Sequence, residues 1–257
     1  SWLVLLSGAE QTITVFWRST RIAESSLSAD PLRNLPIYLQ ATQSFTPIKH
    51  DKYMTWNNVQ WKIRMVMFDC YQLLMGGVNK EVSIFCNNCI GPSWHMISAC
   101  LSTVRQLNLM IPPADYIDYI SHMAEYTNAE MREVESEKEW PVALLGGKIH
   151  IHLIHYPSVA AGSEAWHRRE QRINSDRCYY VLVETDGCTY NDLKRFDNLP
   201  FKHKVALVHK SYPDIKCAFK INGYEQIGAV TDSYCFHPLL PLRKYDQFNW
   251  MKFLKQK

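Results

Sequence analysis

The stretch KIHIHLIHYPSVAAGSEAWHRREQRIN, residues 148–174, sets the architecture that the sequence predicts. It begins with apolar residues and histidines in alternation, which is the two-residue period of a half-buried strand. Tyr156 and Pro157 interrupt this pattern, and a helix with three arginines follows. A histidine-bearing strand that leads into an arginine-bearing helix predicts a site for an anionic ligand.

The same strand-to-helix pattern repeats downstream. Residues 177–184 (RCYYVLVE) are almost continuously apolar, which is typical of a strand buried on both faces. Thr189 and Asp192 have the spacing of a capping box at the start of the next helix, and residues 204–208 form another apolar run. We therefore predict an α/β fold with mainly parallel, Rossmann-like sheet units and helices on both faces, in two α/β halves.

The predicted halves are residues 54–140 and residues 141–257, and the second half contains the basic helix. The first half contributes a short strand at residues 81–86, amphipathic helices at 55–76 and 115–126, and a charge-rich surface helix or loop at 130–138. Residues 1–53 are polar and weakly periodic, so we expect a poorly ordered N-terminal extension, with Met54 as a candidate start of the native protein.

Composition narrows the class of protein. The chain has 257 residues, of which 47% are hydrophobic, so it can bury a large core. Its 28 basic and 25 acidic residues are too evenly balanced for a general nucleic-acid binder. Eight cysteines are scattered through apolar segments, which favours reduced, mostly buried thiols. Because no apolar run approaches the roughly 18 residues of a membrane span, we predict a soluble cytoplasmic protein with at most peripheral membrane contact.

Polar residues follow the predicted strands. In open parallel sheets, ligands bind outside the carboxyl ends of the strands, so these residues are expected along one edge. The residues at these strand ends are Asn87, Asn88, Cys89, His155, Tyr156, Asp186, His209 and Lys210.

The basic helix has a clear buried face. Arg169 falls on that face, where an unpaired charge is costly, so its guanidinium must reach the edge of the core or meet an anion. Arg168 and Arg172 lie next to it and complete a cluster suited to carboxylate or phosphate. A structural ion pair with a nearby carboxylate explains Arg169 equally well. The apolar residues that mark the buried face recur at every seventh position: Val159, Trp166 and Ile173.

Three residues are candidates for catalysis, each with a structural alternative. His155 lies at a strand end, where an imidazole can move protons, whereas His150 and His152 are better explained as core or hydrogen-bonded histidines. Cys89 precedes a predicted helix, which can lower a thiol pKa, although a structural thiol is the more common case. Asp186 stands two residues after a glutamate and can hold Mg²⁺ or Mn²⁺, yet Asp-Gly is equally an ordinary turn.

Several segments resemble one known family: SIFCNNCIG (83–91), PPADYIDYI (112–120), PVALLGGKIHIHLIHY (141–156), WHRREQRIN (166–174), TDGCT (185–189) and the tract from 196 to 224. Together they resemble the bacterial exopolysaccharide-biosynthesis proteins of unknown function (domain of unknown function 1919). The chain departs from that pattern at Pro92 and Ala161. The resemblance implies a two-part α/β protein found with capsule and exopolysaccharide genes, labelled in some cases as a candidate transferase.

Two functions follow from these observations as hypotheses. The first is a transferase of surface-polysaccharide assembly that acts on a nucleotide-sugar or sugar-phosphate. Its phosphate would be held by the three arginines and Lys210, its sugar hydroxyls by Asn87 and Asn88, and His155 or Asp186 would be the base or metal contact. The second is a non-catalytic module that binds a sugar-phosphate or a partner enzyme of the assembly machinery. A third hypothesis is acyl or thiol chemistry at Cys89.

Overall fold

A computed structural model describes residues 55–75, 82–88, 109–185, 187–233 and 235–256. The chain divides into two compact units, Ser1–Ile63 and Arg64–Lys257. Helix α3 (Trp56–Met75) contains the boundary, and every other described element belongs to the second unit. The predicted halves, 54–140 and 141–257, stay a prediction, as does the extension at 1–53, which lies outside the described residues.

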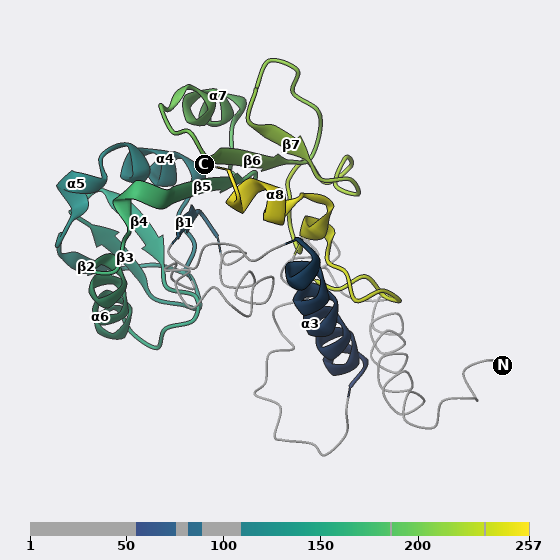
Figure 1. Ribbon diagram of the computed structural model, residues 1–257. Helices are drawn as coiled ribbons and strands as arrows, with labels where there is room; N and C mark the ends of the chain where they lie inside the picture. Colours follow the sequence, from purple (N-terminus) through teal and green to yellow (C-terminus); the bar gives the residue numbers. More distant parts are fainter. Residues whose placement is uncertain (1–54, 76–81, 89–108, 186, 234, 257) are drawn as a thin grey trace, which may run out of the picture. The chain divides into compact units, whose positions relative to one another are not determined.

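The second unit contains a four-stranded parallel sheet with the order β1-β5-β6-β7 (Figure 1). Alternate residues of β5 point into different core clusters, with Tyr180 and Leu182 on one face and Val181 and Val183 on the other. This explains the continuous apolar runs and confirms a mixed α/β fold with buried parallel strands. The strands are β1 (Ser83–Cys86), β5 (Cys178–Val183), β6 (Lys204–Val208) and β7 (Ala218–Lys220).

A second, three-stranded sheet is antiparallel and has the order β2-β3-β4. Its strands are β2 (Met131–Val134), β3 (Val142–Leu145) and β4 (Ile149–His152). The prediction that the histidine-bearing strand joins the parallel sheet is therefore wrong. Gly146 and Gly147, with φ of 59° and 70°, form a tight turn between β3 and β4, and so short a connection joins only antiparallel strands. The prediction of a helix or loop throughout 130–138 is also wrong, since β2 lies there.

Helices cover the parallel sheet and the second sheet. Pro113 occupies the first turn of α4, as expected from its fixed φ. Thr189 and Asp192 form the predicted capping box of α7. Helix α6 begins after Ser158, whose side chain accepts a hydrogen bond from the backbone of Ala161, and ends before the predicted buried position at 173. The bounds are α4 (Pro113–Ser121), α5 (Met123–Tyr126), α6 (Val159–Glu170) and α7 (Tyr190–Asn198).

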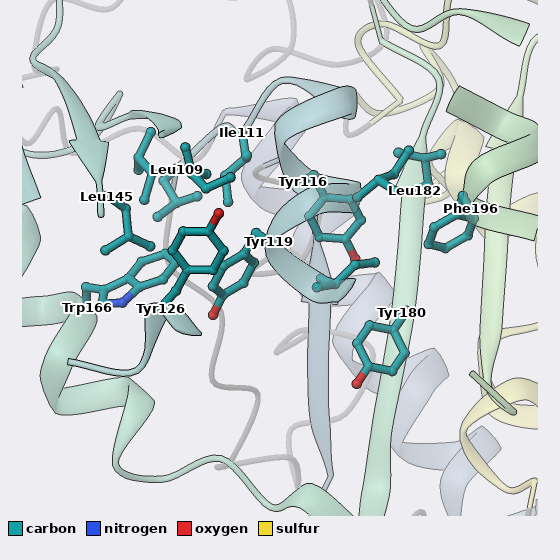
Figure 2. Close-up of a cluster of buried hydrophobic side chains, with 14 of the residues drawn as sticks. Leu109, Ile111, Tyr116, Tyr119, Tyr126, Leu145, Trp166, Tyr180, Leu182 and Phe196 are labelled. Atoms are coloured by element: carbon teal, nitrogen blue, oxygen red, sulfur yellow. The ribbon is translucent and has the colours of Figure 1, made fainter. Parts of the chain in front are cut away.

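An aromatic cluster links the helices to the second sheet (Figure 2). The ring of Tyr119 in α4 lies 5.3 Å from Trp166 of α6 and 5.9 Å from Tyr126 of α5, measured between centroids. The first contact is edge-on and the second is tilted, and aromatic pairs of this kind contribute about 1 kcal/mol each beyond the burial of apolar area. Tyr116 and Leu182 lie farther along the same cluster, next to Phe196 of α7, so one continuous core extends from the parallel sheet to α6.

The other face of the parallel sheet is covered by the C-terminal part of the chain. Trp250 and Phe253 of α8 pack there with Tyr245, which belongs to a short 3₁₀ segment. Arg64 of α3 is fully buried and forms a two-contact ion pair with Asp246. The remaining bounds are η4 (Ser175–Arg177), η5 (Lys244–Gln247) and α8 (Trp250–Leu254).

Six cysteines lie among the described residues, and all are free. The prediction of reduced thiols holds for them, but only Cys86 is buried, whereas Cys70 and Cys235 are exposed. None of the described helices combines the length and the apolar character needed to cross a membrane.

Candidate functional site

Three parallel strands, β1, β5 and β6, end next to one another. Asn87, the first residue after β1, is buried, and its side-chain amide donates to the carbonyl of Val183 at 3.0 Å while its oxygen accepts from the Val183 backbone at 2.8 Å. Asn88 is half-buried and accepts a hydrogen bond from the thiol of Cys86. Asn87 therefore extends the pairing of β1 with β5, and its amide is occupied by the backbone.

Glu184 follows β5 directly and is only 3% exposed. Its Oε2 accepts from the backbone N–H of His209 at 2.8 Å and lies 2.7 Å from the His209 Nδ1, and its Oε1 accepts from the hydroxyl of Tyr212 at 2.5 Å. An ionised carboxylate only accepts hydrogen bonds, so its contact with the His209 ring is made through a proton on Nδ1 and leaves Nε2 outside that contact. We call this set of residues the Glu184–His209–Tyr212 cluster.

A histidine held through Nδ1 by a carboxylate is arranged for proton transfer or ligand binding at Nε2. The backbone and the carboxylate fix both the ring orientation and the tautomer, which is the role of the acidic residue in catalytic triads. Burial, followed by the hydrogen bond to Glu184, raises the pKa of Tyr212 well above its usual range. The phenol therefore remains a hydrogen-bond donor at neutral pH and keeps Glu184 in place.

Two groups next to the cluster are suited to a phosphorylated sugar. Lys210 is exposed, and its Nζ lies 5.3 Å from the centre of the Tyr212 ring. Tyr190, at the start of α7, stacks on Tyr212 with the ring centres 5.9 Å apart and is 46% exposed. A cation and a partly exposed tyrosine therefore lie beside Tyr212 of the cluster, although Lys194 also lies over the Tyr190 ring, at 5.4 Å. Such groups bind phosphate and planar or sugar rings respectively.

Thiol chemistry finds no support at this edge. Burial, assisted by the negative charges of Glu184 and Asp192, raises the pKa of Cys188 to about 12. A thiol with so high a pKa is a poor nucleophile at neutral pH. Cys89, the predicted nucleophile, lies outside the described residues.

The predicted metal contact was a pair of carboxylates at positions 184 and 186. Both oxygens of Glu184 already accept hydrogen bonds from His209 and Tyr212, so this carboxylate is engaged. Asp186 lies outside the described residues. Within the described ranges, no group of three or more His, Cys, Asp or Glu side chains is placed to hold a metal ion.

The histidines of the second sheet belong to a different sheet from this edge, since β4 pairs with β3 and bridges Met110 through His152. His155 is exposed in the turn after β4. His152 Nδ1 accepts from the indole of Trp140 at 3.1 Å, and His150 contacts Asp115 of α4. His150 and His152 are thus hydrogen-bonded residues, as their position in the strand predicted.

The arginines of α6 face different surroundings. Arg168 is exposed and makes a 3.4 Å ion pair with Glu164, and Arg172 is exposed after the end of the helix. Arg169 donates to the hydroxyl of Tyr156 at 3.0 Å and lines a cavity of about 50 Å³ beside β1. Ligand pockets are usually about 300–1,000 Å³, so this cavity does not accommodate a sugar-phosphate as it stands.

Comparison with known proteins places these features in a family. Residues 62–255 match the family described as "Domain of unknown function (DUF1919)". The chain belongs to this family. It is also similar to a Haemophilus influenzae protein named "Uncharacterized protein", with 32% identity over 180 residues, which cover 68% of this chain and 84% of that protein.

The DUF1919 match contains both sheets and the whole Glu184–His209–Tyr212 cluster. The sequence predicted His209 and Lys210 as ligand contacts but did not single out Tyr212 or Tyr190. It identified Glu184 only as a metal ligand. A glutamate directly after a run of buried apolar residues was the available signal, because a carboxylate at such a position needs nearby donors.

Proposed function

We propose that this DUF1919 protein is a transferase of surface or exopolysaccharide assembly that acts on a nucleotide-sugar or sugar-phosphate. Support comes from the carboxyl edge of the parallel sheet, where Rossmann-like sheets bind their ligands. The observation that carries the proposal is the buried contact of Glu184 with the His209 Nδ1, which leaves Nε2 to act as a general base. A group transfer to a hydroxyl acceptor needs such a base.

In this proposal each residue at the edge has a separate task. His209 Nε2 removes the proton from the attacking hydroxyl, and Glu184 stabilises the imidazolium that forms. The hydroxyl oxygen bonds to the anomeric carbon of the donor sugar while the bond from that carbon to the phosphate oxygen breaks, and the phosphate or nucleotide leaves. Lys210 binds the donor phosphate, and Tyr190 stacks on the sugar or nucleobase. His155 and Asp186 are less suited to the role of base, because His155 follows a strand of the other sheet and Asp186 lies outside the described residues.

The proposed location is the cytoplasm, where nucleotide-sugars are donors. The free cysteines among the described residues are consistent with a reducing compartment. The three arginines of residues 168–172 have a secondary role in this proposal, since α6 packs on the second sheet and both Arg168 and Arg172 are exposed. They would bind an acidic partner or the acceptor.

The test is release of nucleotide from UDP-glucose, UDP-N-acetylglucosamine and GDP-mannose, with and without Mn²⁺, together with thermal shifts for each donor. His209→Ala should lower turnover by about 10²–10⁴-fold, the usual contribution of a general base. His150→Ala is the matched control. His150 lies on the other sheet, and its backbone N–H and Nδ1 make the same two contacts with the carboxylate of Asp115 in α4. It should leave turnover unchanged.

Two results distinguish the alternatives. Full turnover in a folded His209→Ala variant contradicts the proposed base. A second result is a thermal shift with the donor but no turnover. If Arg172→Ala or Arg169→Ala abolishes this shift and His209→Ala keeps it, the protein is a non-catalytic module that binds sugar-phosphate through these arginines. Surface-polysaccharide content of a deletion strain that expresses each variant connects either result with assembly.

A further inference from the structure

The outward face of α3 is apolar. Leu73 and Leu74 are each 84% exposed, the highest values among the large hydrophobic residues described. Positions separated by three, four, seven and eight residues lie on one side of a helix, so these side chains form a single stripe, with Asp69 at its border. We call it the α3 stripe. Its members are Val66, Met67, Cys70, Leu73 and Leu74.

The opposite side of α3 explains why the stripe faces outward. Arg64 is fully buried and is held by Asp246, with a distance of 2.6 Å between its Nη2 and Oδ1. Breaking a buried ion pair costs roughly 3–5 kcal/mol, so the pair fixes the rotation of the helix. Soluble amphipathic helices usually bury their aliphatic residues and expose their charges. In this helix Arg64 is buried, whereas the aliphatic stripe is exposed together with Lys62 and Asp69, and an exposed aliphatic stripe favours an apolar surface as its partner.

A leucine-rich loop continues the apolar surface. The loop is Pro238–Leu242 (PLLPL), in which Leu239 is 67% exposed and Leu240 is 48% exposed. Arg64 donates to the carbonyl of Pro241 at 3.4 Å. A cavity of about 440 Å³ is lined by Met67 on the α3 stripe and by Leu242 on the loop. The stripe and the loop therefore border the same hollow and form one surface.

The segment that follows the leucine-rich loop in the sequence is basic. Residues 243–257 contain five basic residues and one acidic residue, a net of +4, whereas the whole chain has a net charge of +3. Trp250 and Met251 of α8 line the same cavity, and Lys252 of that helix and Lys255, which directly follows it, are exposed. The excess positive charge of the chain is thus concentrated in the segment that adjoins the leucines.

We propose that this surface docks on an anionic lipid bilayer. The surface consists of the α3 stripe, the Pro238–Leu242 loop, Lys252 and Lys255. Protein interfaces are enriched in Tyr, Trp and Arg and depleted of Lys, whereas the exposed side chains of this surface are aliphatic residues and lysines, and Trp250 is buried. A bilayer accepts aliphatic side chains below its headgroups, while lysines meet the anionic phosphates. The docking does not depend on any activity at His209.

Vesicle co-sedimentation of the full chain tests the proposal. The protein should bind phosphatidylcholine vesicles that contain about one third phosphatidylglycerol, bind pure phosphatidylcholine poorly, and dissociate at high salt. Two paired variants, Leu73→Ser with Leu74→Ser and Leu239→Ser with Leu240→Ser, should each lower the affinity more than tenfold. Lys252→Ala should lower it about fivefold, which corresponds to roughly 1 kcal/mol for each basic residue near the membrane.

Lys138→Ala is the matched control for charge, since Lys138 is exposed in the segment between β2 and β3. It should bind like the unmodified chain, and circular dichroism should show that every variant is folded. Failure of the unmodified chain to bind anionic vesicles overturns the proposal, as does binding that both leucine variants retain. A third outcome is that the chain does not bind vesicles but is a dimer by light scattering. If the paired substitution Leu73→Ser with Leu74→Ser dissociates this dimer, the surface binds a second copy of the chain instead.

Discussion

His209 directly follows strand β6 of the parallel sheet, and His150 lies within strand β4 of the second sheet. Each histidine makes the same pair of contacts with a carboxylate. In the parallel sheet, Oε2 of Glu184 meets the backbone N–H and Nδ1 of His209 at 2.8 and 2.7 Å. In the second sheet, Oδ2 of Asp115 meets the backbone N–H and Nδ1 of His150, both at 2.8 Å. The side chains of the first pair are 4% and 10% exposed, whereas those of the second are 26% and 52% exposed.

The two pairs have the same hydrogen-bond geometry but differ in their exposure to water. Water competes for the exposed pair and screens it, so that contact contributes little free energy and fixes the ring weakly. The buried pair has lost water, so every donor around Glu184 depends on that carboxylate. The same contacts therefore make His209 a preorganised group and His150 a surface residue. Five substitutions compare the two regions, from the largest expected effect to the smallest.

Glu184→Ala should have the largest effect. It removes the acceptor for His209 and Tyr212 in a buried site, and loss of one member of such a group costs roughly 3–5 kcal/mol. Urea unfolding followed by circular dichroism measures the loss. A change below about 1 kcal/mol would mean that water replaces the carboxylate, and the comparison between the two pairs would lose its basis.

Tyr212→Phe removes only the hydroxyl that donates to Oε1 of Glu184. Hydrogen bonds to charged groups contribute about 1.5–3 kcal/mol, so the free energy of unfolding should fall by that amount. A double-mutant cycle with Glu184→Ala measures the coupling. Additive effects of the two substitutions would show that the hydroxyl does not act through the carboxylate.

The helix caps next to the two regions offer a second matched pair. Thr189 and Asp192 satisfy each other's backbone N–H groups at the start of α7, whereas Ser158 makes a single 3.3 Å contact at the start of α6. Thr189→Ala should cost about 1–2 kcal/mol and Ser158→Ala about 0.5 kcal/mol. Thermal unfolding measures both, and equal losses would contradict the predicted difference.

Asp115→Ala should have the smallest effect. The exposed pair with His150 contributes about 0–1 kcal/mol, and this contribution should decrease as salt is added. Urea unfolding at low and high ionic strength tests the prediction. A loss as large as that of Glu184→Ala would mean that exposure does not decide the strength of these pairs.

The sequence alone determined the strands that are buried on both faces and the caps of the helices. The run from Cys178 to Val183 is apolar at nearly every position, and only a sheet covered on both sides accommodates such a strand. Thr189 and Asp192 form a capping box because they lie three residues apart, which is a property of the local chain. His209 was likewise expected at a strand end because an apolar run precedes it.

Only the tertiary structure decided which strand pairs with which and which side chains meet. The alternation at His150 and His152 specifies a half-buried strand, yet it does not name the neighbour, and the short turn at Gly146 directed that strand to β3. Glu184 meets His209 because β5 and β6 are neighbours in register, 25 residues apart in the chain. Local patterns report burial, whereas contacts between distant residues depend on strand order and register, which the whole core selects.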